Sequence, residues 1–131
     1  MPIKERWKVE IPDGYRILER EFAISGIQHY KDEFFKIVKK GNMSFGMKQD
    51  TKNKYDSNAI KVTASRKGFF GKKEATIGFI PAEMAGQISD AKVFDDLIMR
   101  PKAVYIGDDG YIDFKVDLLV KKESFEKYEN V

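Results

Sequence analysis

The chain has 131 residues, of which 42% are hydrophobic and 34% are charged, with a formal net charge of +3 and no cysteine. This length suits one domain with a core of its own. The lack of cysteine excludes disulfides and thiolate metal sites, and it is typical of a reducing compartment, so we expect a cytoplasmic protein. No apolar run approaches the ~20 residues of a membrane span, and the charged N-terminus lacks the apolar segment of a signal peptide. The net charge is small for a nucleic-acid binder, so such a role must rest on local clusters of basic residues.

The first third of the chain predicts an extension, a strand and a helix. Residues 1–20 have mixed charge, and we expect an N-terminal extension that either packs on the domain or forms a flexible arm. Alternating apolar residues predict a strand over residues 21–27, where Gly26 indicates a bulge or a close backbone approach. Apolar residues then recur at helical spacing, which predicts a short helix over residues 31–39.

The middle of the chain predicts strands that are joined by polar connections. Period-two alternation predicts three strands, over residues 43–48, 59–65 and 75–80. The connection over residues 66–73 places Phe69 and Phe70 between basic residues, and we expect it to be a hairpin tip. These two aromatic side chains either lie exposed, where they would contact bases or a membrane interface, or fold back over the barrel mouth.

The last part of the chain predicts two helices, two strands and a tail. Pro81 suits the first turn of a helix, and we expect a second short helix over residues 91–99 that ends at Arg100-Pro101. Two strands are expected on either side of an Asp-Gly hairpin turn, over residues 102–106 and 111–119. Residues 121–131 form a charged tail that is frayed or weakly helical.

This order of elements predicts an α+β fold that is mainly β. Five or more short strands, with two short helices inserted between the fourth and fifth core strands, favour an antiparallel barrel or half-barrel. We expect an extension over residues 1–20, a barrel domain over residues 21–120 and a charged tail over residues 121–131.

The stretch from Asn53 to Ile60 places polar turn formers directly before an apolar strand. Asn and Asp side chains bond the nearby backbone in turns, so Tyr55 and Asp56 are expected where a turn enters a strand. A ring beside a carboxylate can stack a flat group and accept a hydrogen bond from a hydroxyl. The alternative is a structural Asx-type turn with Tyr55 packed at its rim.

Catalysis finds little support in the sequence. His29 is the single histidine and follows a strand end among polar residues, so we expect it on the surface. The adjacent pairs Asp95-Asp96 and Asp108-Asp109 would point in different directions, so they do not indicate a metal site. No phosphate-binding loop occurs. We expect no enzyme, no cofactor and no metal, with a metal-dependent nuclease as an alternative that would need converging carboxylates.

Three groups of residues together resemble the HIRAN domain family. They are Phe22-x-Ile24-x-Gly26 with Tyr30, then Asn53-x-Tyr55-Asp56-x-Asn58-Ala59-Ile60, then Ile77-Gly78-Phe79-Ile80-Pro81 with Ala85. The resemblance runs from about Phe22 to about Leu119 and implies an OB-like modified barrel with helices inserted before its last strands. It also implies a DNA-binding module that captures single-stranded DNA at a free 3′ end, in replication-fork or DNA-damage processing.

The resemblance also implies which residues bind DNA. Asp56 would accept a hydrogen bond from the terminal 3′-hydroxyl, Tyr55 would help to form the base pocket, and Asn53 begins the same motif. The family's Arg-Tyr pair falls on the segment Gln28-His29-Tyr30, so a phosphate-binding cation is missing and Tyr30 is the expected substitute for the family's tyrosine.

Nearby aromatic and basic side chains would complete a site for a single strand, which is held by stacking on aromatic rings and by cations along the phosphates. We expect Phe79 as the floor of the pocket, and the three lysines Lys48, Lys52 and Lys54 at the phosphates. Larger relatives fuse this domain to ATPase or nuclease modules, so the expected partner is a separate helicase or nuclease. The second hypothesis is a protein-protein interaction module that uses the tip at Phe69-Phe70 or a barrel edge.

Overall fold

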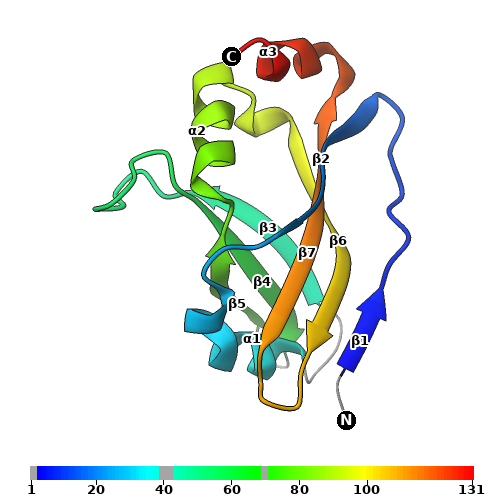
Figure 1. The fold of residues 1–131 in the computed structure, drawn as a ribbon, viewed down its shortest axis with the longest axis vertical. Coiled ribbons are helices and arrows are strands. Elements are labelled where there is room, and N and C mark those ends of the chain that lie inside the picture. Colours follow the sequence, from blue (N-terminus) through cyan, green and yellow to red (C-terminus); the bar gives the residue numbers. More distant parts are fainter. Residues whose placement is uncertain (1–2, 39–42, 69–70) are drawn as a thin grey trace.

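The computed structural model describes residues 3–38, 43–68 and 71–131 (Figure 1). Within these residues the seven strands are β1 Ile3–Arg6, β2 Tyr15–Ala23, β3 Met43–Gln49, β4 Ile60–Gly68, β5 Gly71–Phe79, β6 Leu97–Ile106 and β7 Ile112–Lys121. The α-helices are α1 Lys31–Val38, α2 Ala82–Ala91 and α3 Phe125–Glu129. Short 3-10 helices are η1 Ile27–Tyr30, η2 Phe94–Asp96 and η3 Lys122–Ser124. None of the helices in the described ranges has the length and apolar character to cross a bilayer.

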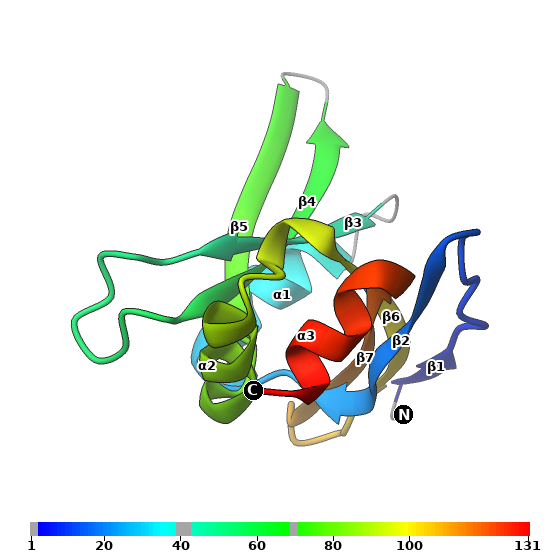
Figure 2. The same cartoon turned by 90° about the horizontal axis from the view of Figure 1, so that it is seen from above.

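The strands form two antiparallel sheets that enclose the core (Figure 2). The order is β1-β6-β7-β2 in the four-stranded sheet and β3-β4-β5 in the other. Phe45 of β3 and Phe114 of β7 join the sheets, with ring centroids 5.0 Å apart, and Phe34 of α1 lies 5.8 Å from Phe114. The predicted mainly β, antiparallel α+β fold is therefore confirmed.

The two sheets do not close into a barrel in the described part of the chain. One isolated bridge, between Ser25 and Phe79, joins the segment after β2 to the end of β5. Gly78 permits this approach, because a Cβ there would lie 2.5 Å from Ile24 Cγ2 and 2.7 Å from the Ser25 carbonyl oxygen. The structure therefore fits the predicted barrel only loosely.

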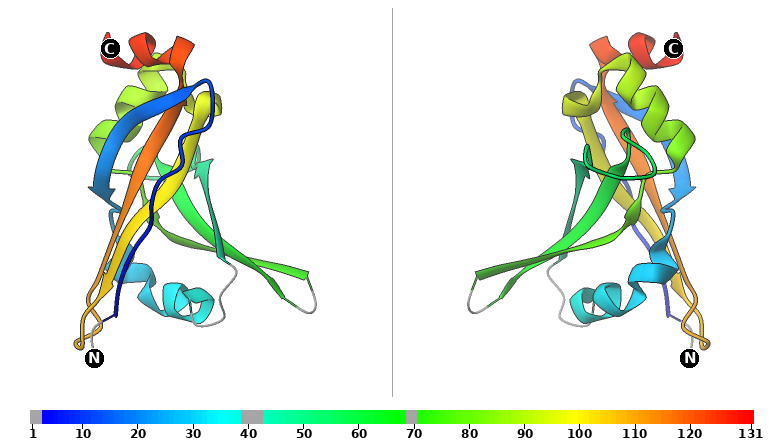
Figure 3. Two further views of the ribbon diagram at one scale, coloured as in Figure 1. Left: turned by 90° about the vertical axis from the view of Figure 1, so that its right-hand side faces the viewer. Right: turned by 90° about the vertical axis from the view of Figure 1, so that its left-hand side faces the viewer.

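The predicted strands 43–48, 59–65, 75–80 and 111–119 are all present with small shifts of their ends. β4 and β5 continue through Gly68 and Gly71 and form a long hairpin that extends from the rest of the molecule (Figure 3). The turn after β6 is the predicted Asp-Gly hairpin, in which the Gly107 N–H donates to the Tyr111 carbonyl oxygen (2.9 Å). Phe69 and Phe70, predicted at the tip of the long hairpin, lie outside the described residues.

The predicted strand over residues 21–27 is wrong in its second half. β2 begins at Tyr15 and ends at Ala23. Gly26 then adopts a left-handed conformation (φ 73°) that turns the chain into η1, which glycine permits without a Cβ penalty. The chain therefore leaves the sheet at the position where Gln28 and His29 begin the candidate site.

The second helix predicted over residues 91–99 is also wrong. Only α2 and the short turn η2 lie between β5 and β6, and β6 starts at Leu97. Pro101 lies inside β6, at a register shift in the pairing with β7. The pairing of β6 with β1 covers Ala103 to Ile106 and does not include Pro101. A proline can occupy a strand at such a place because its missing N–H is not needed by a neighbouring strand. It therefore did not mark the end of a helix.

Both ends of the described chain pack on the sheets. β1 pairs with β6, and the Trp7 N–H donates to the Lys102 carbonyl oxygen (2.9 Å), so residues 3–7 are not a free arm. At the other end, α3 lies next to α2 (Figure 2), where Gln87 Nε2 donates to the Tyr128 carbonyl oxygen (2.8 Å). The Tyr128 ring is buried and its hydroxyl donates to Glu19 Oε2 (3.2 Å).

Candidate nucleic-acid interface

The loop between β3 and β4, residues 50–59, extends from the sheet beside α2 (Figure 1). Asn53 holds its shape, since its Oδ1 accepts the N–H groups of Tyr55 (2.9 Å) and Asp56 (3.0 Å). The Asp50 N–H donates to the Ala59 carbonyl oxygen (2.8 Å) and closes the base of the loop. The predicted turn chemistry is therefore present, and it presents Tyr55 and Asp56 on a hydrogen-bonded backbone.

Asp56 is half-buried and has one carboxylate oxygen engaged by the turn. Its Oδ1 accepts the Asn58 N–H (2.9 Å), and Asn58 Oδ1 in turn accepts the Ser89 hydroxyl of α2 (3.0 Å). Among the described residues no hydrogen bond reaches Asp56 Oδ2. The carboxylate can therefore support the turn and still offer an acceptor to a ligand hydroxyl.

Tyr55 is 97% exposed. The alternative in which its ring packs at the rim of the turn is therefore wrong. The same exposure means that the ring does not pack against Tyr30 or Phe79, with which we expected it to share a pocket. Tyr55 is instead an open aromatic surface beside the Asp56 carboxylate.

Tyr30 and Phe79 do come together, with ring centroids 6.2 Å apart and a tilt of 55° between the rings. In the β4–β5 ladder Phe79 lies opposite Lys61, the second residue of β4. The loop over residues 50–59 leads into β4, so the turn and the aromatic pair belong to the same end of this ladder. Lys61 is half-exposed there, and the sequence did not single it out because only the register places it beside Phe79.

Gln28 has a structural task that the sequence did not reveal. Its Nε2 donates to the Ile112 carbonyl oxygen and its Oε1 accepts the Ile112 N–H (3.2 Å), which fastens η1 to β7. His29 is exposed, as predicted. Both residues line a hollow of about 230 Å³ together with Tyr111, which is 55% exposed. Tyr111 was not singled out, although an aromatic residue directly after the Asp109-Gly110 turn was a signal for it.

The predicted phosphate-binding lysines differ in their surroundings. Lys48 is exposed and forms an ion pair with Glu74 across the sheet. Lys52 and Lys54 are exposed on the loop beside Tyr55, and no ion pair of theirs is found among the described residues. Lys52 and Lys54 are therefore better placed than Lys48 to meet a phosphate.

The described residues contain no group of three or more His, Asp or Glu side chains arranged to hold a metal ion. The candidate interface contains two aromatic groups, one at Tyr55 and one at Tyr30 and Phe79, with the Asp56 carboxylate and two lysines near Tyr55. A third group, around His29 and Tyr111, lies where η1 meets β7.

Comparison with known proteins connects this arrangement to a family. Neither the curated proteins nor the solved structures include a significant match to the chain. The family model of the HIRAN domain matches residues 17–121, which is most of the 131-residue sequence. The HIRAN domain is generally a DNA-binding module and is not itself catalytic. On this match, the chain belongs to the HIRAN domain family.

Proposed function

We propose that this protein binds single-stranded DNA at free 3′ ends, with the turn over Asn53, Tyr55 and Asp56 as the reading site. The observation that carries the proposal is the turn itself. A carboxylate with one uncommitted oxygen lies next to an aromatic ring that is 97% exposed, on a backbone fixed by side-chain hydrogen bonds. The sequence match to a DNA-binding family supports the choice of ligand.

In this proposal each group has a separate task. Asp56 accepts a hydrogen bond from the terminal 3′-hydroxyl, and a hydrogen bond to a charged group contributes about 1.5–3 kcal/mol. Tyr55 stacks on the last base, while Lys52 and Lys54 contact phosphates. Tyr30 and Phe79, at the same end of the β4–β5 ladder, offer a second aromatic surface for a neighbouring base.

The setting that fits this activity is the processing of replication forks or damaged DNA, where free 3′ ends occur. Because the HIRAN domain binds rather than catalyses, the chemistry would come from a separate helicase or nuclease. Stimulation of such an enzyme on a substrate with a free 3′ end, and not on a covalently closed circle, is the expected sign of this role.

The proposal is tested by fluorescence anisotropy with a short labelled single strand and with a blunt duplex of the same length. We expect wild type to bind the single strand more tightly than the duplex. In a plot of log affinity against log salt concentration, the slope should become shallower by about 0.7 for each phosphate contact that a substitution removes. Lys52→Gln with Lys54→Gln removes two such contacts. Asp56→Asn should weaken binding while keeping the turn, because an asparagine oxygen still accepts the Asn58 N–H.

Asp95→Asn is the matched control, since Asp95 is an exposed carboxylate outside the loop. It should leave the affinity unchanged. Equal affinity of wild type and Asp56→Asn for the single strand, or preference for the duplex, would overturn the proposal. Tight association with another protein that is insensitive to salt would point instead to an interaction module.

A further inference from the structure

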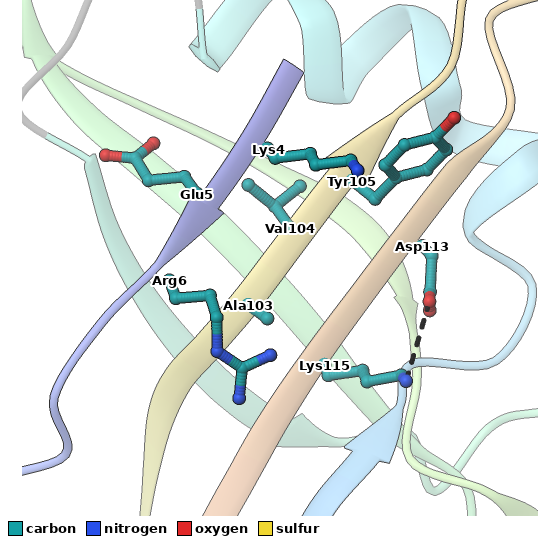
Figure 4. A pocket seen from close by; sticks show the side chains of 8 residues that line it. All are labelled: Lys4, Glu5, Arg6, Ala103, Val104, Tyr105, Asp113 and Lys115. Atoms are coloured by element: carbon teal, nitrogen blue, oxygen red, sulfur yellow. Dashed lines mark ion pairs between the residues drawn. The ribbon is translucent and has the colours of Figure 1, made fainter. Parts of the chain in front are cut away.

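The outer face of the four-stranded sheet carries a hollow of about 200 Å³ that the candidate interface does not include (Figure 4). Lys4 and Arg6 come from β1, Ala103 and Tyr105 from β6, and Lys115 from β7. Three adjacent strands therefore place three cations on the same face as the Tyr105 ring, and Tyr105 is 38% exposed.

The strand register explains why this surface is hollow. Residues that lie opposite each other on neighbouring strands share one face of the sheet, as do residues two apart along a strand. Two neighbouring rows on this face are Lys4–Tyr105–Asp113 and Arg6–Ala103–Lys115–Ala23. The alanines contribute only methyl groups between longer side chains, so the floor is low and the walls are basic or aromatic.

This hollow adjoins the one around Gln28, His29 and Tyr111. Both are lined by Asp113, and Ala23 of the second row also lines the other hollow. Two exposed tyrosines, Tyr111 and Tyr105, therefore lie along one continuous surface.

The cations of the hollow are held by weak contacts. Lys4 Nζ lies 5.7 Å from the centroid of the Tyr105 ring, and Lys115 lies 3.8 Å from Asp113 Oδ2. Arg6 donates to Glu21 Oε1 (2.5 Å), and this hydrogen bond, with help from Lys115, holds the pKa of Glu21 below its usual value. All three cations lie on an exposed surface, where ion pairs contribute little and a phosphate can compete for the cations.

The carboxylates leave a positive balance on this face. Glu5 lies between Lys4 and Arg6 in β1 and also lines the hollow, but its side chain points away from Tyr105 and Lys115 (Figure 4). Asp113 and Glu21 remain against three cations. The arrangement of exposed rings and cations is the one that single-stranded nucleic acid uses, with bases on rings and phosphates on lysines and arginines.

On these grounds, and resting on the proposed function, we propose that a bound single strand continues beyond the 3′-end site across this face. Tyr111 and Tyr105 stack bases, and Lys4, Arg6 and Lys115 contact the backbone phosphates. Each hollow is smaller than the roughly 300 Å³ at which sites for enclosed small molecules begin, which favours an extended chain over a compact ligand.

The experiment measures the affinity of the 131-residue chain for single strands of increasing length, from four to sixteen thymidines, at several salt concentrations. Lys4→Gln with Lys115→Gln removes two phosphate contacts, and the control Lys127→Gln changes an exposed lysine of α3. Tyr105→Thr removes the ring and keeps a residue that suits a strand. Arg6 is left in place because its removal would also leave Glu21 of β2 without its ion-pair partner, which would change two charges at once. Circular dichroism and thermal unfolding confirm that each variant is folded.

For wild type we expect the affinity to rise with length until both hollows are filled. In the double lysine variant the gain with length is lost, the salt slope for long strands is shallower by about 1.4, and the affinity for the shortest strand is unchanged. Tyr105→Thr should weaken only long strands, by roughly 5- to 150-fold. Lys127→Gln should match wild type.

Two results would overturn the inference, and they are distinct. If wild type binds the four-thymidine strand and the hollow variants retain the full gain with length, the strand does not cross this face while the proposed function stands. If wild type binds no strand of any length, both proposals fail together.

Discussion

The side chains that shape the candidate interface are neutral amides. Asn53 accepts two backbone N–H groups, and Gln28 both donates to and accepts from Ile112. An amide can do this because it carries a donor and an acceptor, whereas an arginine carries donors only. In the position where the family resemblance implies an arginine, Gln28 therefore exchanges a phosphate-binding cation for a clamp between η1 and β7.

Gln28→Ala should lower the free energy of unfolding by about 1–3 kcal/mol, because the partly buried N–H and C=O of Ile112 lose their partner. Urea denaturation measures the change. His29→Ala is the matched control, because His29 follows Gln28 in the chain and its side chain is exposed. The free energy of unfolding of this variant should stay within about 0.5 kcal/mol of wild type. A Gln28→Ala variant as stable as the His29→Ala variant would show that the clamp contributes nothing.

The residues of the turn could be predicted because their bonds are local. Asn53 contacts backbone groups two and three residues away, which turn chemistry anticipates. The surroundings of Tyr111 and Lys61 could not be predicted in the same way, although the turn before Tyr111 was a signal for that residue itself. Their neighbours are set by the packing of η1 on β7 and by the β4–β5 register, over separations that no short pattern encodes.

At the scale of elements, the contact between the segment after β2 and the end of β5 decides where η1 lies. Gly78 makes this contact possible, since any Cβ would overlap Ile24 Cγ2 and the Ser25 carbonyl oxygen. The Ser25 N–H and carbonyl both bond Phe79 at 2.9 Å. Gly78 therefore permits both the bridge between Ser25 and Phe79 and the placement of Tyr30 beside Phe79.

Gly78→Ala should lower the free energy of unfolding by about 1–3 kcal/mol, as overpacked cores do, since a backbone oxygen is among the overlapping atoms. Gly86→Ala is the opposite case, because Gly86 lies in α2 with no atom within 4 Å of an added Cβ. That change should raise stability by about 0.5–1 kcal/mol, through the better helix propensity of alanine. Thermal unfolding compares them, and a Gly78→Ala variant that is as stable as wild type would contradict the close approach.

Element prediction succeeded where the pattern was confined to one strand and failed where packing chose between patterns. The apolar residues of β3 and of the first half of β7 alternate cleanly in the sequence, and β3 pairs with β4 in regular register. The apolar residues between Val93 and Met99 also recur at helical spacing, yet from Leu97 onward they pair with β7. Tertiary pairing outweighed local spacing there. The proline at position 101 is compatible with a strand because the pairing of β6 with β1 ends at Ala103.

At the scale of the whole molecule, the C-terminal helix ties distant parts together through Tyr128. Its hydroxyl donates to Glu19 of β2, 109 residues earlier, and its carbonyl accepts from Gln87 of α2. Burial raises the pKa of Tyr128 above its usual value of 10.0, and the negative charge of Glu19 raises it further. Tyr128 therefore stays protonated in the folded state at pH values where it ionises in the unfolded chain.

This shift predicts an alkaline loss of stability with a known sign. A raised pKa gives stability that is complete below pH 10 and is lost above it, because the unfolded tyrosine then ionises and the folded one does not. At pH 11 the loss from this group is about 1.4 kcal/mol. Tyr128→Phe cannot ionise, so its free energy of unfolding should fall less between pH 9 and pH 11 than that of wild type. Urea titrations at both pH values measure the difference. If the free energy of unfolding falls equally in wild type and in Tyr128→Phe, ionisation of Tyr128 does not cause the alkaline loss of stability.

The most direct test of the account uses one short single strand in two forms, with a 3′-hydroxyl and with a 3′-phosphate. Wild type should prefer the hydroxyl form by roughly 10- to 150-fold, since the phosphate removes the hydrogen-bond donor to Asp56 and brings negative charge toward its carboxylate. Asp56→Asn should narrow this preference without unfolding the loop. Equal affinity for both strands, unchanged by the substitution, would show that the carboxylate does not read the end of the chain.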